Sequence, residues 1–255
     1  MRCQLLTIRK VYNRLLQPDH CLLCLAPVHN QPLAICSGCQ LDLPWLLHAC
    51  RHCGLPIPPE DHECSACQEQ RQPFLLARSA WRYTFPVDAL VSGFKYSKRW
   101  PAGRLLSSLL AEHLQYLHDE RQLQLAEALI PVPLSAKRLR QRGYNQANMI
   151  AGWLGKPLQL PVLDKALQRV RHTRIQQGLD ARQRQDNMRN AFVVSQPRQI
   201  AGRHLALVDD VLTTGATCAA ATRTLLAAGA RRVDVYCLAR TGLADNPDTW
   251  PGNHS

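Results

Sequence analysis

The sequence predicts an open α/β fold, a mainly parallel sheet with flanking helices, preceded by a small cysteine-rich module. Two observations predict this architecture. From residue 125 onward, short apolar runs alternate with segments that carry apolar residues at helical spacing, as in βαβ units. Before residue 70, eight cysteines occur in four CxxC pairs, a pattern typical of metal-binding knuckles.

The clearest βαβ unit lies between residues 205 and 239. LALV (205–208) is predicted to be a buried strand, and CAAATRTLLAA (218–228) a helix followed by Gly229 in the left-handed conformation. VDVYCLA (233–239) is predicted to be the next strand. Such a unit joins parallel strands by a right-handed crossover, and ligands of these folds bind beyond the carboxyl ends of the strands.

Earlier segments extend this alternation of strands and helices. The sequence predicts an amphipathic N-terminal helix, because Leu5, Ile8, Tyr12 and Leu15 recur at helical spacing; a membrane-surface anchor is the alternative. The predicted strands are 77–85, 129–132 and 191–194, and the predicted helices are 87–96, 102–117 and 147–155. The predicted division is a helix at 1–19, the cysteine module at 20–70, the α/β domain at 75–242 and a tail at 243–255.

Composition limits the class of protein. Hydrophobic residues make up 46% of the chain, which is enough for a packed core and excludes a disordered protein. The formal net charge is +12, mostly from arginine, and indicates a phosphate-rich partner, either a nucleic acid or a phosphorylated metabolite. No apolar run is long enough for a membrane span and no signal peptide is evident, so we expect a cytoplasmic protein without membrane insertion.

The four CxxC pairs predict structural zinc. A two-residue spacer lets both thiolates of a tight turn face one metal, and two turns complete a tetrahedral shell of four sulfurs. We expect one or two Zn²⁺ ions, with the pairs used in sequence or interleaved; an iron–sulfur cluster and a redox CxxC are the minor alternatives. His48, His52 and His62 are expected to be surface residues. The predicted ligands are Cys21, Cys24, Cys36, Cys39, Cys50, Cys53, Cys64 and Cys67.

Two adjacent carboxylates, Asp209 and Asp210, follow the predicted strand 205–208, and TTGAT (213–217) leads into the next helix. Backbone N–H groups at a helix N-terminus favour an anion, and Gly215 lets the backbone approach a phosphate closely. The carboxylates then lie where ribose hydroxyls would fall. The stretch contains neither GxxxxGK[ST] nor GxGxxG. The alternative is a helix cap made of threonines behind two acidic residues.

LALVDDVLTTGAT resembles the phosphoribosyl-pyrophosphate (PRPP) binding motif of type I phosphoribosyltransferases. The chain also resembles the ComF/GntX family over nearly all of residues 20–240. The stretches that carry this resemblance are that motif, the four CxxC pairs, IPVPLSAKRLRQRGYNQA and HTRIQQGLDARQRQDNMRNAF. The resemblance implies a type I phosphoribosyltransferase-like domain behind an N-terminal zinc-ribbon module with four-cysteine sites. It also implies a role in DNA uptake, DNA utilisation or competence, with DNA-uptake machinery proteins as partners.

The resemblance also implies roles for residues. Asp209 and Asp210 would bind the ribose diol and, through it, Mg²⁺, while Lys137 and Arg138 would stabilise the leaving pyrophosphate. A hood built by residues 75–100, with Lys95 and Tyr96, would admit the acceptor. The implied 5′-phosphate loop is Thr213, Thr214, Gly215, Ala216 and Thr217, the implied pyrophosphate loop is Ser135, Ala136, Lys137 and Arg138, and the signature residues are Arg142, Gly143, Asn145 and Gln146.

Two classes of function follow. The first is a phosphoribosyltransferase; the chain has no room for a glutaminase domain, which argues against a purine-pathway amidotransferase. The second is a non-catalytic accessory protein that binds single-stranded nucleic acid through basic and aromatic side chains. Arg174 stands where many relatives have proline, and the stretch 169–189 could equally be a solvated helix face. The candidate nucleic-acid contacts are Arg140, Arg142, Arg171, Arg174 and Arg182.

Overall fold

The computed structural model describes residues 19–29, 32–170 and 191–242. The predicted N-terminal helix, most of the arginine-rich stretch and the predicted tail lie outside these ranges.

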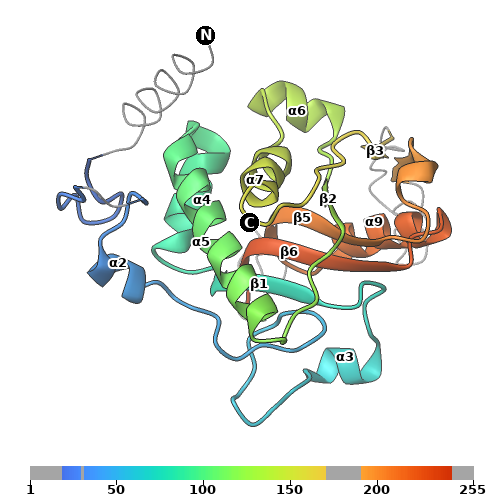
Figure 1. The fold of residues 1–255 in the computed structure, drawn as a ribbon, viewed down its shortest axis with the longest axis horizontal. Helices are drawn as coiled ribbons and strands as arrows, with labels where there is room; N and C mark the ends of the chain where they lie inside the picture. Colours follow the sequence, from blue (N-terminus) through green and yellow to red (C-terminus); the bar gives the residue numbers. More distant parts are fainter. Residues whose placement is uncertain (1–18, 30–31, 171–190, 243–255) are drawn as a thin grey trace, which may run out of the picture.

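A four-stranded parallel sheet forms the centre of the molecule (Figure 1). Its strands are β1 (Ala77–Arg82), β2 (Ala128–Pro131), β5 (His204–Leu212) and β6 (Arg232–Arg240), in the order β1-β6-β5-β2. All three pairings are parallel, which confirms the predicted sheet. β5 and β6 occupy the two central positions and are buried along almost their whole length.

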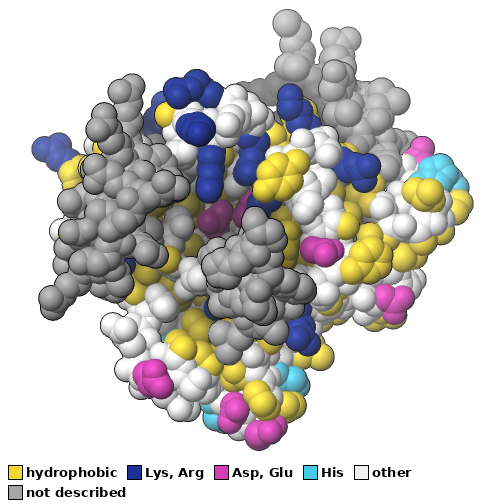
Figure 2. Space-filling view, turned by 180° about the vertical axis from the view of Figure 1, so that it is seen from behind, with side chains coloured by type: hydrophobic (Ala, Val, Ile, Leu, Met, Phe, Trp, Pro, Cys, Tyr) yellow, Lys and Arg dark blue, Asp and Glu magenta, His cyan; other side chains and the backbone are white. Residues whose placement is uncertain are grey.

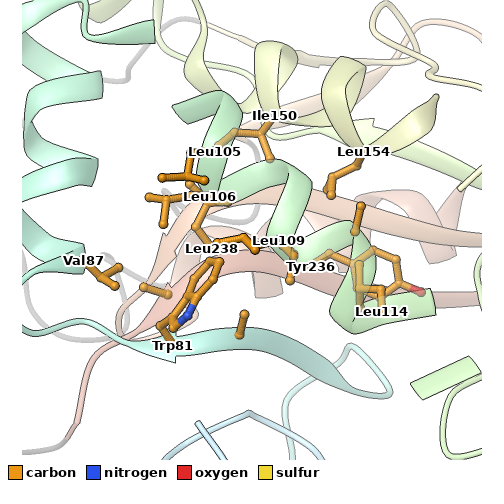
Figure 3. Close-up of a cluster of buried hydrophobic side chains, with 14 of the residues drawn as sticks. Trp81, Val87, Leu105, Leu106, Leu109, Leu114, Ile150, Leu154, Tyr236 and Leu238 are labelled. Atoms are coloured by element: carbon orange, nitrogen blue, oxygen red, sulfur yellow. The ribbon is translucent and has the colours of Figure 1, made fainter. Parts of the chain in front are cut away.

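Helices cover both faces of this sheet, and alternate residues of β5 divide between them. Ala206 and Val208 pack in one layer with α4 (Val87–Ser97), α5 (Trp100–Asp119) and α7 (Gln146–Gly155). Leu205 and Leu207 pack in the other with α9 (Ala216–Ala227). A strand buried on both sides needs an uninterrupted apolar run, which is what LALV supplies. Figure 3 shows the α5 leucines meeting Trp81, Tyr236 and Leu238 in the first layer.

Three elements of the α/β domain were not predicted: a short basic helix, one strand and a 3-10 turn. α6 (Ala136–Arg142) is a short basic helix that begins after Ser135, whose side chain accepts a hydrogen bond from the Arg138 N–H, and ends at Gly143, where φ is 81°. β3 (Leu167–Arg169) pairs antiparallel with β4 (Phe192–Val194). Strands of three residues carry too little alternation to be distinguished from loops in the sequence. A 3-10 turn, Pro197–Gln199, precedes β5.

The cysteine module is packed onto the α/β domain rather than held apart from it. Its helices are α2 (Ser37–Leu41) and α3 (Ser65–Glu69). The segment 44–46 runs along the open edge of β1: the Leu46 N–H donates to the Ala80 carbonyl at 2.9 Å, and Trp45 lies against Trp81. Phe74, between the predicted module and the predicted α/β domain, is buried.

None of the described helices combines the length and apolarity needed to cross a membrane.

The packing of α4 on α5 gives a test of the core. A Cβ added at Gly103 would lie 2.7 Å from the Phe94 ring, whereas one at Gly152 would meet nothing within 4 Å. We expect Gly103→Ala to lower the free energy of unfolding by about 1–3 kcal/mol through overpacking. Gly152→Ala should be neutral or stabilise by up to about 1 kcal/mol, since alanine favours helix. Denaturant unfolding of both variants measures these changes in stability. Equal changes in the two variants would contradict the close packing of Gly103 against Phe94.

Candidate functional site

The acidic doublet lies inside the sheet, not after it. β5 continues four residues past the predicted end, so Asp209 and Asp210 belong to the strand, and Asp210 is only 4% exposed. Each carboxylate accepts the N–H of the following residue: Asp210 N to Asp209 at 2.9 Å, and Val211 N to Asp210 at 2.7 Å. These bonds fix both side chains at the carboxyl end of a central strand, where α/β folds bind ligands.

A lysine from the hood compensates this acidic pair. The Lys95 ammonium, on α4, lies 2.9 Å from Oδ1 of Asp210. Burial alone would lower the pKa of Lys95, but the Asp210 carboxylate raises it above its usual value. The other oxygen of Asp210, Oδ2, is buried without a hydrogen-bond partner.

Asp209 carries the strongest electrostatic perturbation of the site. Burial and the neighbouring Asp210 raise its pKa to about 7, although Lys95 and Arg142 act in the opposite direction. A carboxyl group in this state gains from a bound cation or from hydroxyl donors. The pair therefore matches the ligand preferences of Mg²⁺ and of a vicinal diol.

Above the doublet lies a cavity of about 550 Å³, which we call the acidic-floor cavity. Figure 2 shows the corresponding hollow, in which Lys and Arg side chains gather around acidic ones. Burial and Arg138 lower the pKa of Arg169, so two cations lie close together on this rim. The charged residues that line the cavity are Lys95, Lys98, Arg138, Arg142, Arg169, Asp209 and Asp210.

The RGYNQ segment joins this cavity to the hood. Asn145 caps α7 by accepting the Ala147 N–H and also donates to the Val132 carbonyl. The Tyr144 hydroxyl donates to the Phe94 carbonyl of α4. Gln146 and Arg142 line the cavity, each with one buried polar atom that lacks a partner. With Asp210, three buried unpartnered groups therefore meet at one cavity.

The TTGAT stretch divides between two cavities. Gly215 precedes α9 with φ 77°, a conformation that favours glycine, and the Thr214 hydroxyl accepts the Ala216 N–H at 3.3 Å. Thr217 lines the acidic-floor cavity. Thr213, Thr214 and Gly215 line a second cavity of about 220 Å³, which they share with cysteines of the module; we call it the ribbon-side cavity.

The remaining predicted site residues separate into three groups. Arg138 and Arg142 line the acidic-floor cavity. Ala136, Lys137 and Arg140 are exposed on α6 and are not among its lining residues, while Ser135 caps that helix. Arg171, Arg174 and Arg182 lie outside the described residues. Sequence reasoning assigned no individual role to Lys98 or Arg169; only their positive charge marks them, and that signal is shared with many other residues.

The eight CxxC cysteines form two clusters of four. Cys21, Cys24, Cys36 and Cys39 make the first cluster, and Cys50, Cys53, Cys64 and Cys67 the second. Within each, all four sulfurs lie within 4.8 Å of one another, so the pairs are used in sequence and no histidine contributes.

Both clusters fit a tetrahedral metal. Cys24 and Cys36 sulfurs are 3.7 Å apart, and those of Cys53 and Cys64 are 3.6 Å apart; four thiolates at about 2.3 Å from Zn²⁺ would be separated by roughly 3.8 Å. Although burial opposes it, backbone N–H groups lower the pKa of Cys21 to about 6 and of Cys50 to about 7. These two thiols ionise most readily in their clusters. Burial raises the pKa of Cys53 to about 11, so a bound metal would have to displace the remaining thiol protons.

Family models match both parts of the chain. A double zinc ribbon domain matches residues 12–68, and a phosphoribosyl transferase domain matches residues 147–251. Competence protein F of Haemophilus influenzae is 34% identical over 221 residues, which cover 86% of this chain and 96% of that protein. DNA utilization protein YhgH of Escherichia coli K12 is 36% identical over 226 residues, 88% of this chain and 98% of that protein.

More distant proteins share parts of these features. Competence protein ComFC of Bacillus subtilis is 25% identical over 218 residues, covering 81% of this chain and 84% of its own. Among solved structures, the glutamine PRPP amidotransferase of B. subtilis matches with a TM-score of 0.39 and 18% identity, over 58% of this chain and 30% of that one.

The raised pKa of Asp209 predicts that the free energy of unfolding of the ligand-free protein depends on pH. Because the folded state holds this proton up to about pH 7 and the unfolded chain releases it near 3.8, stability falls as pH rises between these values. Asp209→Asn should therefore gain unfolding free energy relative to wild type across this window, by up to about 1.4 kcal/mol per pH unit. Chemical denaturation at pH 5 and pH 8 measures it.

The matched control is Asp164→Asn, since Asp164 is exposed. It should stay within about 0.5 kcal/mol of wild type at both pH values. An Asp209→Asn difference that does not grow with pH would refute the assignment.

Proposed function

The chain belongs to the family of competence protein F and YhgH, and from this premise we propose that it binds PRPP with Mg²⁺ in the acidic-floor cavity and transfers the phosphoribosyl group. The observation that supports this most is the meeting of three buried polar atoms without partners at one cavity: Oδ2 of Asp210, Nη1 of Arg142 and Oε1 of Gln146. Buried polar atoms without a hydrogen-bond partner are rare in folded proteins. Where they occur together at a cavity, a bound ligand can supply the missing hydrogen bonds.

The charge pattern supports a sugar phosphate in particular. In this proposal the floor, Asp209 and Asp210, accepts hydrogen bonds from the two ribose hydroxyls. The cationic rim, including Arg138 and Arg169, binds the phosphate groups, and the repulsion between these two arginines is relieved by an anion. A single phosphate or a nucleic-acid backbone would engage the rim but would leave the acidic floor unused.

The proposed chemistry is electrostatic. When bound, Mg²⁺ would neutralise charge on the pyrophosphate. The carboxylates of the floor face the sugar, where positive charge develops as the bond to pyrophosphate breaks, and they need no reorganisation because backbone N–H groups already hold them. Lys95 would move from Asp210 toward the departing pyrophosphate. The hood above, with exposed Tyr96, would admit the acceptor.

PRPP binding gives the direct test. In calorimetry with Mg²⁺, wild type should bind PRPP, and Asp210→Asn should weaken binding at least about 100-fold, because a carboxylate that accepts a sugar hydroxyl is lost and the Lys95 charge is left uncompensated. Asp164→Asn should bind as wild type does. Absence of PRPP binding by the folded, zinc-loaded wild type would refute the proposal.

A second function is favoured by exposed basic and aromatic residues near the cavity and by the names of the relatives, which refer to competence and DNA utilization. Arg138 and Arg140 are exposed on α6, and Tyr96 and Trp100 expose 74% and 51% of their surfaces. The Arg142 guanidinium lies 5.3 Å from the centroid of the Tyr96 ring, and exposed cations together with aromatic rings suit single-stranded DNA, which they bind by phosphate contact and base stacking. We propose that this surface, formed by α6 with Tyr96 and Trp100, also binds single-stranded DNA, and that it overlaps the proposed PRPP site at Arg138 but not at the acidic floor.

Salt dependence tests the DNA proposal. Arg138→Ala with Arg140→Ala should weaken binding of an oligo-dT and reduce the slope of log K against log salt by about 1.4, since each phosphate contact on a single strand adds roughly 0.7. Arg198→Ala with Arg223→Ala, exposed arginines that do not line the cavity, is the matched control and should leave the slope unchanged. Asp210→Asn should leave DNA affinity nearly intact; an equal loss in that variant would refute separate functions.

A further inference from the structure

A buried arginine connects the second cysteine cluster to the TTGAT loop. Arg240, the last residue of β6, is 6% exposed. Its Nε donates to the Cys53 carbonyl at 3.0 Å. Its Nη1 donates to the Leu212 carbonyl at 3.0 Å and to the Thr213 carbonyl. One guanidinium therefore joins a metal-ligand turn to the first residue of the proposed phosphate loop.

This arginine lacks the partner that buried cations need. In the described part of the chain, no carboxylate lies within ion-pair distance of Arg240, and its hydrogen bonds there go to carbonyls and to the Thr241 hydroxyl. A buried guanidinium without a counter-charge is strongly destabilising. Four thiolates around one Zn²⁺ carry a net charge of about −2, so the metal-loaded second cluster supplies the missing anion beside Cys53.

A second contact acts in parallel. Phe74 lies just after the module, and its ring would be 3.6 Å from a Cβ at Gly215. Phe74, Arg240 and Cys53 line the ribbon-side cavity together with Thr213 and Thr214. The loop is thus held from its ribbon side by two groups, while its other side faces the acidic floor through Thr217.

We propose that Arg240 is a positioning residue through which the metal state of the second cluster sets the conformation, and hence the ligand affinity, of the loop 213–217. The first cluster has no such role, because its cysteines pack in the opposite core layer with the α4 and α5 residues. The part that concerns affinity rests on the proposed function; the coupling of metal to loop does not.

The coupling is tested on the loop itself, without PRPP. Hydrogen exchange of the amides 213–217 is measured in wild type and in Arg240→Gln, each holding two zincs by metal analysis. We expect at least about tenfold faster exchange in Arg240→Gln, because the carbonyls of Leu212 and Thr213 lose their donor. Arg240→Lys keeps the positive charge, but one ammonium cannot reach both the Cys53 carbonyl and the carbonyls of Leu212 and Thr213. Its exchange rate at 213–217 should therefore lie between those of wild type and Arg240→Gln. Unchanged exchange in Arg240→Gln would overturn the proposal.

The two clusters provide a matched pair. Cys64→Ser with Cys67→Ser removes the second metal, and Cys36→Ser with Cys39→Ser removes the first. Only the former should accelerate exchange at 213–217. If either variant does not fold, Arg240→Gln decides alone. Equal acceleration by both pairs would overturn the assignment to the second cluster.

The reciprocal effect separates positioning from general stability. By linkage, PRPP with Mg²⁺ should make release of one of the two zincs to a colorimetric chelator less favourable at equilibrium in wild type, and should do so much less in Arg240→Gln. Wild type that binds no PRPP while the exchange results hold would refute the proposed function but not the coupling. Binding of PRPP with equal effects on zinc release in both proteins would refute the coupling of affinity to the metal.

Discussion

The site depends on the burial of two carboxylates at the end of a central strand. Hydrophobic packing fixes β5 between two helix layers, and the same strand carries Asp209 and Asp210 into a region where their charges are poorly solvated. Lys95 of α4 reduces the cost of burying these charges by pairing with Asp210, and this ion pair connects the hood to the acidic floor. The hood, the RGYNQ segment and the cationic rim can all be understood as the surroundings that such an unfavourable pair requires.

The cysteine module takes part in this arrangement. Its two clusters belong to different core layers, so the module packs against both faces of the sheet. The first cluster packs with the helices that support the hood, and the second lies beside the loop that follows the doublet. A metal bound at these clusters would therefore contribute to the organisation of the α/β domain as well as to the folding of the module.

Much of the fold was accessible from the sequence, for identifiable reasons. LALV is buried on both faces and so is continuously apolar, and VDVYCLA is interrupted by one buried carboxylate, Asp234, which is hydrogen-bonded to His204 and Arg232. The CxxC spacing marked all eight cysteines of the two clusters. The strand 191–194 was predicted and is β4, whereas its partner β3 was missed. α6 was also missed, since capping by Ser135 and Gly143 forms a helix where the apolar pattern is weak. The doublet, the loop and Arg138 were recognisable as local motifs. Arg240 was not, because its role arises only when residues 53, 212 and 240 meet in space.

The segment 44–46 has one more consequence. It occupies the hydrogen-bonding edge of β1, with the Leu46 N–H on the Ala80 carbonyl and the Arg82 N–H on the Pro44 carbonyl. Uncovered edges of parallel sheets recruit strands from other molecules. Because the same segment connects the two cysteine clusters, whatever stabilises those clusters also keeps this edge covered against strand addition from another molecule.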